Sequence, residues 1–219
     1  MSETVKPRRT YDGTGRRERA AKTRSEIVAA AGVLFRDRGY VGVTMPAIAE
    51  VAGVAVETLY RGFGSKAGLF TAVIEAAVAG GASRAEVAVE SRPAIRAVIE
   101  EPDPRRKLER YAATQPGIHR RSGPLLRVLD EAASVDPELE ALRTEMETGR
   151  LMGLGRFMAS LAEAGALRRE LSVDDARDII WTLCSLEVHD RLVLQRGWSS
   201  ERYETWLAAT LIGALLARD

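Results

Sequence analysis

The stretch Thr44-Met-Pro-Ala-Ile-Ala-Glu-Val-Ala-Gly-Val-Ala-Val-Glu-Thr-Leu-Tyr-Arg-Gly-Phe63 predicts two short helices joined by a tight turn. Thr44 can cap the first helix by accepting hydrogen bonds from its free amides. Pro46 suits a first turn, where the backbone N–H has no carbonyl partner to lose. Gly53 can adopt a positive φ angle and so end the first helix sharply.

The apolar positions of this stretch predict which faces are buried. Ile48, Ala49 and Ala52 recur at helical spacing, and Leu59 and Phe63 supply core contacts for a second helix over 56–63. The side chains that we expect to point outward from the second helix are Val56, Glu57, Thr58, Tyr60 and Arg61. A short helix braced by another at a glycine turn indicates a helix-turn-helix, whose second helix enters the major groove of DNA.

The residues around the motif form a longer pattern in fixed register. The matched positions are Ile27-x-x-Ala30-Ala31-x-x-Leu34-Phe35, Arg38-Gly39-Tyr40, Val43-Thr44-Met45-x-x-Ile48-Ala49, Ala52-Gly53-Val54, Thr58-Leu59-Tyr60-x-x-Phe63 and Ser65-Lys66-x-x-Leu69-Phe70. From about Lys22 to Ala79 the chain resembles the DNA-binding domain of the TetR family of transcriptional regulators. The remaining two thirds carries a helical pattern and no further family signature.

Charge is distributed unevenly along the chain. The 219 residues have a formal net charge of +1, but residues 1–70 hold 12 Lys/Arg and 7 Asp/Glu, a net charge of +5. The totals of 32 and 31 leave 20 basic and 24 acidic residues for the rest, a net charge of −4. A basic front joined to an acidic body suits a module that meets phosphates attached to one that does not.

The sequence also indicates a cellular compartment. A single cysteine fits a reducing cytoplasm, where disulfides are rare. No apolar run approaches the roughly 20 residues needed to span a bilayer. Residues 1–24 are polar and basic, without the apolar segment of a secretory signal. We therefore expect a cytoplasmic protein.

Three segments are expected in an all-α chain. Residues 1–20 predict a basic disordered arm, which either keeps the protein soluble or follows the DNA backbone. Residues 21–81 predict a three-helix helix-turn-helix DNA-binding domain, with the motif at 44–63 and a further helix from Ser65 to about Ala79. Residues 82–219 predict a C-terminal helical bundle for effector binding and dimerisation.

Breaks within the C-terminal segment follow Pro, Gly and capping residues. Helices are expected over about 86–101 with an interruption at Pro93, then 103–118, 122–133, 136–164, 172–195 and 199–218. The last helix is apolar over more than half its circumference, so it needs two partners, its own core and a second subunit. The predicted dimer contacts are Trp206, Ala209, Ile212 and Gly213.

No residue constellation predicts catalysis. The two histidines, His119 and His189, are far apart in sequence, and metal, phosphate-loop and serine-hydrolase motifs are missing. Cys184 lies in an apolar helical pattern and is interpreted first as a core residue. We expect neither an enzyme nor a cofactor or metal.

The resemblance implies a homodimer that binds a palindromic DNA operator, usually as a repressor, and that a small molecule releases. The DNA contacts that it places on this sequence are Lys22, Thr44, Val56, Glu57, Thr58, Tyr60 and Lys66. Pro46 departs from the polar or basic side chain that many relatives carry at that position, so base reading from the first helix is not expected. Residues that could line an apolar effector pocket are Tyr111, His119, Leu126, Met152, Phe157, Met158, Trp181 and Cys184.

Two alternatives stay open at this point. One is a dimeric helix-turn-helix protein that binds DNA without any small-molecule effector. The other is a helical ligand-binding protein whose DNA-binding head is vestigial. Retardation of genomic DNA fragments, and stabilisation by small molecules, would separate the three.

Overall fold

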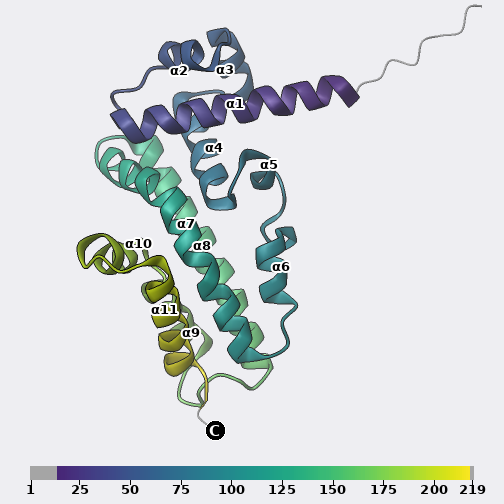
Figure 1. Cartoon of the computed structure of the whole chain (residues 1–219), viewed down its shortest axis with the longest axis vertical. Coiled ribbons are helices and arrows are strands. Elements are labelled where there is room, and N and C mark those ends of the chain that lie inside the picture. The colour runs from purple at the N-terminus through teal and green to yellow at the C-terminus, as the bar shows by residue number, and fades with distance from the viewer. Residues whose placement is uncertain (1–13, 218–219) are drawn as a thin grey trace, which may run out of the picture.

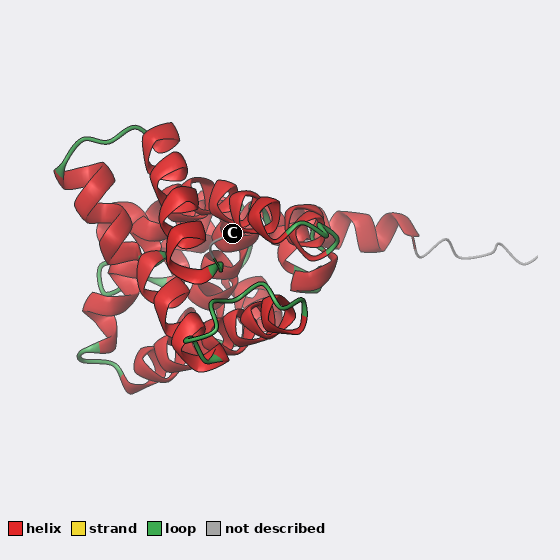
Figure 2. Cartoon of the chain, turned by 90° about the horizontal axis from the view of Figure 1, so that it is seen from below, coloured by secondary structure: helices red, strands yellow, loops and turns green. Residues whose placement is uncertain are grey.

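The computed structural model describes residues 14–217, and within that range every named element is helical (Figures 1 and 2). The elements are α1 (Thr14–Arg38), α2 (Met45–Ala52), α3 (Val56–Phe63), α4 (Lys66–Ala79), α5 (Ala82–Ala85), the 3-10 helix η1 (Val89–Ser91), α6 (Pro93–Ile99), α7 (Pro104–Ala133), α8 (Pro137–Glu163), α9 (Val173–Leu183), α10 (Leu186–His189), the π-helix η2 (Asp190–Gln195) and α11 (Ser200–Leu215). The all-α prediction is confirmed.

The helix-turn-helix lies at one end of the molecule. In Figure 1, α1 runs across the top of the long helices α7 and α8, and α2 and α3 lie above α1, farthest from the body. Ile27, Ala31 and Phe35 of α1 are buried against α2 and α4. Phe35, Tyr40 and Phe70 form an aromatic cluster, with ring centroids 4.7 to 5.9 Å apart. These contacts hold the short helices α2 and α3 on a rigid base.

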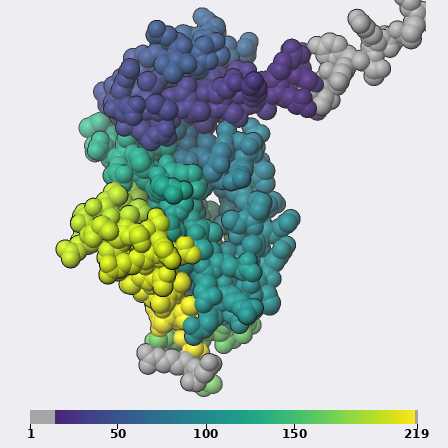
Figure 3. Space-filling view, in the orientation of Figure 1, coloured from purple at the N-terminus to yellow at the C-terminus, as the bar shows by residue number. Residues whose placement is uncertain are grey.

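The body is built around α7 and α8. α7 packs against α4, α8 and α11, and α8 packs in addition against α9. Space-filling atoms of α11 and of η2 cover the lower left side of the body in Figure 3. A second core lies between these helices and includes Leu108, Met158, Ile180 and Leu207.

The core of the head, which consists of α1 to α4, continues into the body. Leu125 and Leu129 of α7 and Leu139 and Leu142 of α8 belong to the same buried cluster as the head residues of α1 and α4. The C-terminal end of α7 and the first turns of α8 therefore form the floor on which the head rests. The head and the body meet through a packed apolar surface and not through a linker alone.

The expected break within residues 103–133 is wrong, because α7 runs without interruption through Pro116 and Pro124. Each proline removes one backbone hydrogen bond and costs about 3 kcal/mol in a helix interior. Burial offsets this cost, since Leu108, Ala112 and Leu125 are fully buried along the same helix. Tertiary packing thus overrides the local signal for a helix end.

The expected continuous helix over 172–195 is also wrong. α9 ends at Leu183, and Ser185 starts α10 by accepting a hydrogen bond from the Val188 amide at 3.3 Å. Ser185 is a residue type that caps helices, so a restart signal was present in the sequence.

Two chain ends differ from the expected bounds. α1 begins at Thr14, so residues 14–20 of the expected disordered arm form helical turns, and residues 1–13 lie outside the described range. α11 ends at Leu215 rather than near residue 218, because the chain then pairs with residues 166–168. The Ala217 amide donates to the carbonyl of Ala166 at 3.0 Å.

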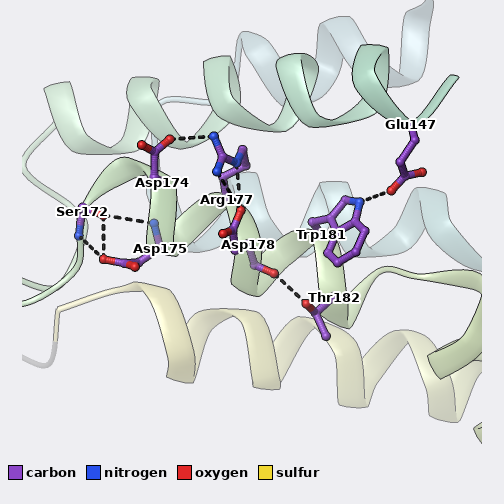
Figure 4. Close-up of polar contacts among 8 residues, drawn as sticks. All are labelled: Glu147, Ser172, Asp174, Asp175, Arg177, Asp178, Trp181 and Thr182. Carbon is purple, nitrogen blue, oxygen red and sulfur yellow. Dashed lines mark hydrogen bonds and ion pairs between the residues drawn. The ribbon is translucent and has the colours of Figure 1, made fainter. Parts of the chain in front are cut away.

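A capping box fixes the start of α9. Ser172 accepts a hydrogen bond from the Asp175 amide at 3.0 Å, and Asp175 accepts in return from the Ser172 amide at 3.3 Å (Figure 4). The Ser172 hydroxyl also donates to the Asp175 carboxylate at 2.6 Å, and this bond, together with the one from the Ser172 amide, holds the pKa of Asp175 below its usual value. Along the same helix, the indole N–H of Trp181 donates to the carboxylate of Glu147, which ties α9 to α8 (Figure 4).

Candidate nucleic-acid interface

The turn between α2 and α3 has the predicted geometry. Thr44 is extended, with φ −115° and ψ 153°, and its hydroxyl accepts from the Ala47 amide at 3.4 Å. Gly53 adopts φ 66° and ψ 33°, a left-handed conformation in which a side chain would be strained. The Val54 amide then donates to the carbonyl of Ala49 at 3.0 Å, which closes the turn.

The outer face of α3 is polar and solvent-exposed. Leu59 is fully buried and anchors the helix to the head. Glu57 and Arg61 are exposed, Thr58 is half-buried, and Tyr60 keeps 52 % of its surface in contact with solvent. A rigid helix therefore presents hydrogen-bonding groups at one extremity of the molecule, which is the arrangement that reading a DNA groove requires.

Val56 is less available than expected. It is half-buried and packs against the core of the head. The reason is helical spacing, because Val56 falls on the same face of α3 as Leu59 and Phe63. The expectation that Val56 points fully outward is corrected, and only part of its side chain faces the solvent.

Lys66 was expected to offer a free ammonium group to phosphate, and the structure places it differently. Its Nζ donates to the carbonyls of Tyr40 at 3.0 Å and Val43 at 3.1 Å. The same nitrogen lies 4.0 Å from the centre of the Tyr40 ring. Lys66 thus connects the loop before α2 to α4, and burial lowers its pKa.

The Tyr40 side chain completes this contact. Burial and the carboxylates of Asp136 and Glu138 raise the pKa of Tyr40 to about 12. Glu138 also accepts a hydrogen bond from the Ser65 hydroxyl at 3.3 Å. The first turn of α8 therefore approaches the start of α4.

Among the basic residues of α1, Lys22 is exposed and forms a solvent-screened pair with Glu26 at 3.8 Å. Its exposed position is compatible with the predicted phosphate contact, which stays a prediction. Arg24 contacts α3, through the carbonyl of Gly62 at 3.1 Å. No spacing rule links residues 24 and 62, so sequence reasoning had no signal for this contact.

The expected effector residues do not all come together. Tyr111, Phe157, Met158, Trp181 and Cys184 belong to or pack against the second core. Leu126 packs against the core of the head instead, and Met152 is 55 % exposed. Met152 lies two positions before Leu154, which is buried, and so falls on the opposite side of α8. Leu126 and Met152 thus lie apart from the residues of the second core, and a pocket that includes them is not formed in this structure by the contacts above.

His119 lies in a buried polar cluster that the sequence did not predict. Its ring centre is 4.8 Å from that of His189, which in turn is 5.1 Å from that of Tyr203. Both ring nitrogens of His119 and the hydroxyl of Tyr203 are buried without a hydrogen-bond partner among the described residues. Buried polar atoms of this kind are rare and call for an explanation.

The groups around this cluster have shifted pKa values. Burial, together with His189, lowers the pKa of His119 to about 4. Burial raises the pKa of the Cys184 thiol to about 12, so this cysteine is neutral and buried as interpreted. Arg150 closes the end of α9 by donating to the carbonyls of Trp181 at 3.0 Å and Cys184 at 2.8 Å.

The expected dimer residues lie on one side of α11. Ala209 and Gly213 are exposed, and Trp206 and Ile212 are half-buried. Trp206 and Ala209 also line an open groove of about 520 Å³, together with Trp198 and Arg202. The Arg202 guanidinium lies 4.1 Å from the centre of the Trp198 ring, so the groove is aromatic and partly cationic.

Residues 14–217 lack features of two other kinds of site. Within them, no group of three or more His, Cys, Asp or Glu side chains is placed to hold a metal ion. No helix of this range has the length and apolar character needed to cross a bilayer.

Comparisons with known proteins agree with this geometry. Residues 27–73 match the sequence model described as bacterial regulatory proteins, tetR family. No curated protein matches the sequence.

Solved structures share the fold over most of the chain. The fatty acid degradation regulator FadR from Bacillus halodurans has a TM-score of 0.69 and 21 % identity, covering 90 % of this chain and 97 % of that one. NalD, the secondary repressor of the MexAB-OprM multidrug efflux pump in Pseudomonas aeruginosa, has a TM-score of 0.67 and 19 % identity, with coverage of 91 % and 98 %. A transcriptional regulator from Saccharomonospora viridis, solved with choline, has a TM-score of 0.67 and 19 % identity, with coverage of 90 % and 100 %. At these identities the likeness shows the fold alone.

The fold and the exposed α3 define a helix-turn-helix DNA-binding protein. The match over residues 27–73 identifies this part of the chain as a DNA-binding domain of the kind found in bacterial regulatory proteins of the tetR family.

Proposed function

We propose that this protein is a transcriptional repressor that binds a palindromic DNA operator as a homodimer and leaves it when a small molecule binds the body. The observation that carries the proposal is the position of α3, a braced helix at the end of the molecule with Glu57, Tyr60 and Arg61 exposed. Because bacterial operator DNA lies in the cytoplasm, the protein acts there.

Two sets of side chains would contact DNA, one at the phosphates and one at the bases. Lys22 and Tyr60 would bind phosphate and so give affinity that falls with salt. Glu57 and Thr58 would face the bases, and Glu57 can accept a hydrogen bond from the N4 amino group of cytosine. Thr44 and the exposed edge of Val56 would add backbone and methyl contacts. Lys66 would contribute by holding the loop before α2 in place.

Selection from fragmented genomic DNA tests the DNA-binding part. The purified protein should enrich a few fragments, and footprinting should reveal two inverted half-sites separated by one helical turn or more. A reporter gene placed behind such a fragment should then be expressed less when the protein is present. If no fragment is retarded at low salt, the vestigial-head alternative gains support.

The dimer would form through α11. Ala209 and Gly213 let a second helix approach closely, and Trp206 and Ile212 add apolar area that the monomer leaves partly exposed. Light scattering at micromolar concentration should give the mass of two chains. Ala209→Glu should yield monomers because it places a charge in the interface, while Ala94→Glu, an exposed alanine of α6, should remain dimeric.

The effector would bind in the body beside His119 and Tyr203. Their unpartnered nitrogens and hydroxyl could hydrogen-bond a polar group of a ligand whose remainder packs among Tyr111, Phe157 and Met158. The solved relative with choline supports a small-molecule effector in this fold. Residues 82–219 would thus carry both effector binding and dimerisation.

A thermal-shift screen tests the effector part. Choline and decanoate are useful first probes, because one carries a permanent positive charge and the other an apolar tail with a carboxylate. A ligand that raises the melting temperature of the protein but not of Tyr203→Phe, and that releases the selected DNA, supports the proposal. A broad panel with no stabilising compound favours the alternative without an effector.

A further inference from the structure

The recognition helix α3 depends on its neighbours for its orientation. It has only eight residues, fewer than an isolated helix needs to be stable in water. Its N-cap residue, Ala55, provides no side-chain hydrogen bond, and Leu59 is its buried anchor. Val56 and Phe63 are only half-buried against the same core, so the tilt of the helix ends depends on further contacts.

Arg24 of α1 makes such a contact at the C-terminal end of α3. Its Nη1 donates to the carbonyl of Gly62 at 3.1 Å. Its guanidinium carbon lies 4.4 Å from the centre of the Phe63 ring. The carbonyls in the last turn of a helix lack intrahelical partners, and a cation there also offsets the helix dipole. The stacked ring adds a cation–π attraction, so two different interactions hold the same point.

A third group lies beside this contact. Glu86, directly after α5, has Oε1 3.7 Å from Nε of Arg24, with 60 % and 40 % of the two side chains exposed. An exposed pair of this kind contributes little. A cavity of about 160 Å³ adjoins it, lined in part by Val28, Ala72 and Ala82. The firm contacts of Arg24 are therefore those with α3, and the contact with Glu86 is loose.

We infer that Arg24 is a positioning residue for reading bases. It fixes the C-terminal end of α3, and with it the angle at which Glu57 and Tyr60 face the groove, and it does not neutralise a DNA phosphate. The inference rests on the proposed role of α3 in DNA recognition. It separates Arg24 from Lys22, two residues earlier, which is free to bind phosphate.

The test compares Arg24→Lys and Arg24→Gln with wild type and with Glu86→Gln as the matched control. The probe is a fluorescein-labelled duplex that wild-type protein selects from genomic fragments, alongside a scrambled duplex, each titrated over a series of salt concentrations. Lysine keeps the charge but lacks the planar fork and stacking surface of arginine. Both Arg24 variants should therefore bind the selected duplex about tenfold more weakly, which is the loss expected for a charge-assisted contact. Their affinity for the scrambled duplex and the salt slope should be unchanged, and Glu86→Gln should bind like wild type.

The opposite pattern overturns the inference. If Arg24 binds phosphate, Arg24→Lys keeps wild-type affinity, whereas Arg24→Gln weakens binding to both duplexes and reduces the salt slope by about 0.9. If either Arg24 variant melts early, Phe63→Leu provides the same comparison, because it removes the ring and leaves the charge. Phe63→Leu should lose affinity for the selected duplex alone, and wild-type affinity there contradicts the inference. Failure of wild-type protein to select any duplex is a different result and refutes the proposed function instead.

Discussion

Arg121 of α7 donates through Nε to the backbone carbonyl of Ala77, over 2.9 Å, at the C-terminal end of α4. A second bond runs from Nη2 to the carbonyl of Val78 at 3.3 Å. Carbonyls in the last turn of a helix have no intrahelical partner. Here a side chain from the body donates hydrogen bonds to such carbonyls at the end of α4, a helix of the head. His119 lies two residues earlier on α7 and so points to a different side of the helix, toward His189 and Tyr203.

Removing this side chain should destabilise the protein. Arg121→Ala leaves two carbonyls without their charged donor, and we expect the free energy of unfolding to fall by about 1 to 3 kcal/mol. Urea titration followed by circular dichroism measures the change. Arg120→Ala is the matched control. Because Arg120 is exposed, this substitution should change the free energy of unfolding by less than about 0.5 kcal/mol. Equal effects at the two positions would contradict the role assigned to Arg121.

Lys66 should contribute mainly to the stability of the folded protein. Lys66→Met removes the two hydrogen bonds to the loop before α2 and should lower the free energy of unfolding by about 1 to 3 kcal/mol. Lys22→Met changes the same charge at an exposed site and should leave stability within about 0.5 kcal/mol. In DNA titrations, by contrast, Lys22→Met should reduce the salt slope by about 0.9, the loss of one phosphate contact. A wild-type melting curve for Lys66→Met would rule out its structural role.

The two exposed residues of α3 should affect DNA binding in different ways. Tyr60→Ala should weaken binding to all duplexes by a similar factor, because it removes a contact with the DNA phosphate backbone, which does not depend on base sequence. Glu57→Lys should change which sequences are preferred, because it replaces an acceptor at the bases by a donor. Glu109→Lys makes the same change of charge on the exposed surface of α7 and should leave the sequence preference unchanged. Repeating the genomic selection with each variant measures all three, and an unaltered preference for Glu57→Lys would place the base-reading surface elsewhere.

The buried cluster predicts how stability depends on pH. The pKa of His119 is lowered to about 4 in the folded protein, against 6.5 for an exposed histidine, because burial and His189 disfavour the charged ring. The folded state therefore binds fewer protons, so the stabilisation is present above pH 6.5 and is lost as pH falls through 4. The loss is about 3 kcal/mol at most, at 1.36 kcal/mol per pKa unit.

The variant His119→Gln isolates this effect. Urea unfolding between about pH 7 and pH 4 should show a smaller decrease in stability for the variant than for wild type. The carboxylates that titrate in the same range are common to both proteins, so the difference between the two curves reports on His119. Parallel curves would show that His119 does not contribute.

Local signals in the sequence were enough to predict the helix-turn-helix. The hydroxyl of Thr44, the positive φ of Gly53 and the spacing of Leu59 and Phe63 each act within a few residues, and each is found as expected. The bounds of α3, Val56–Phe63, are those expected from the same spacing.

Long-range contacts account for what the sequence did not predict. Pro116 lies inside α7 because burial on several sides outweighs one lost hydrogen bond. Lys66 and Arg24 find carbonyl partners 23 to 38 residues away in sequence, at positions that no periodicity relates. His119 and His189 are 70 residues apart by number, yet their rings lie 4.8 Å from each other because α7 and α10 pack together.

The apolar floor beneath the head limits how this regulator can be recombined with others. Leu125, Leu129, Leu139 and Leu142 cover the underside of α1 and α4, so a fragment cut at residue 81 would leave that underside in water. A chimera that transplants the DNA specificity of this protein onto a foreign sensor should therefore carry the junction helices with it, or redesign the foreign surface to match. In this chain, modular exchange follows the packing surface and not the order of the sequence.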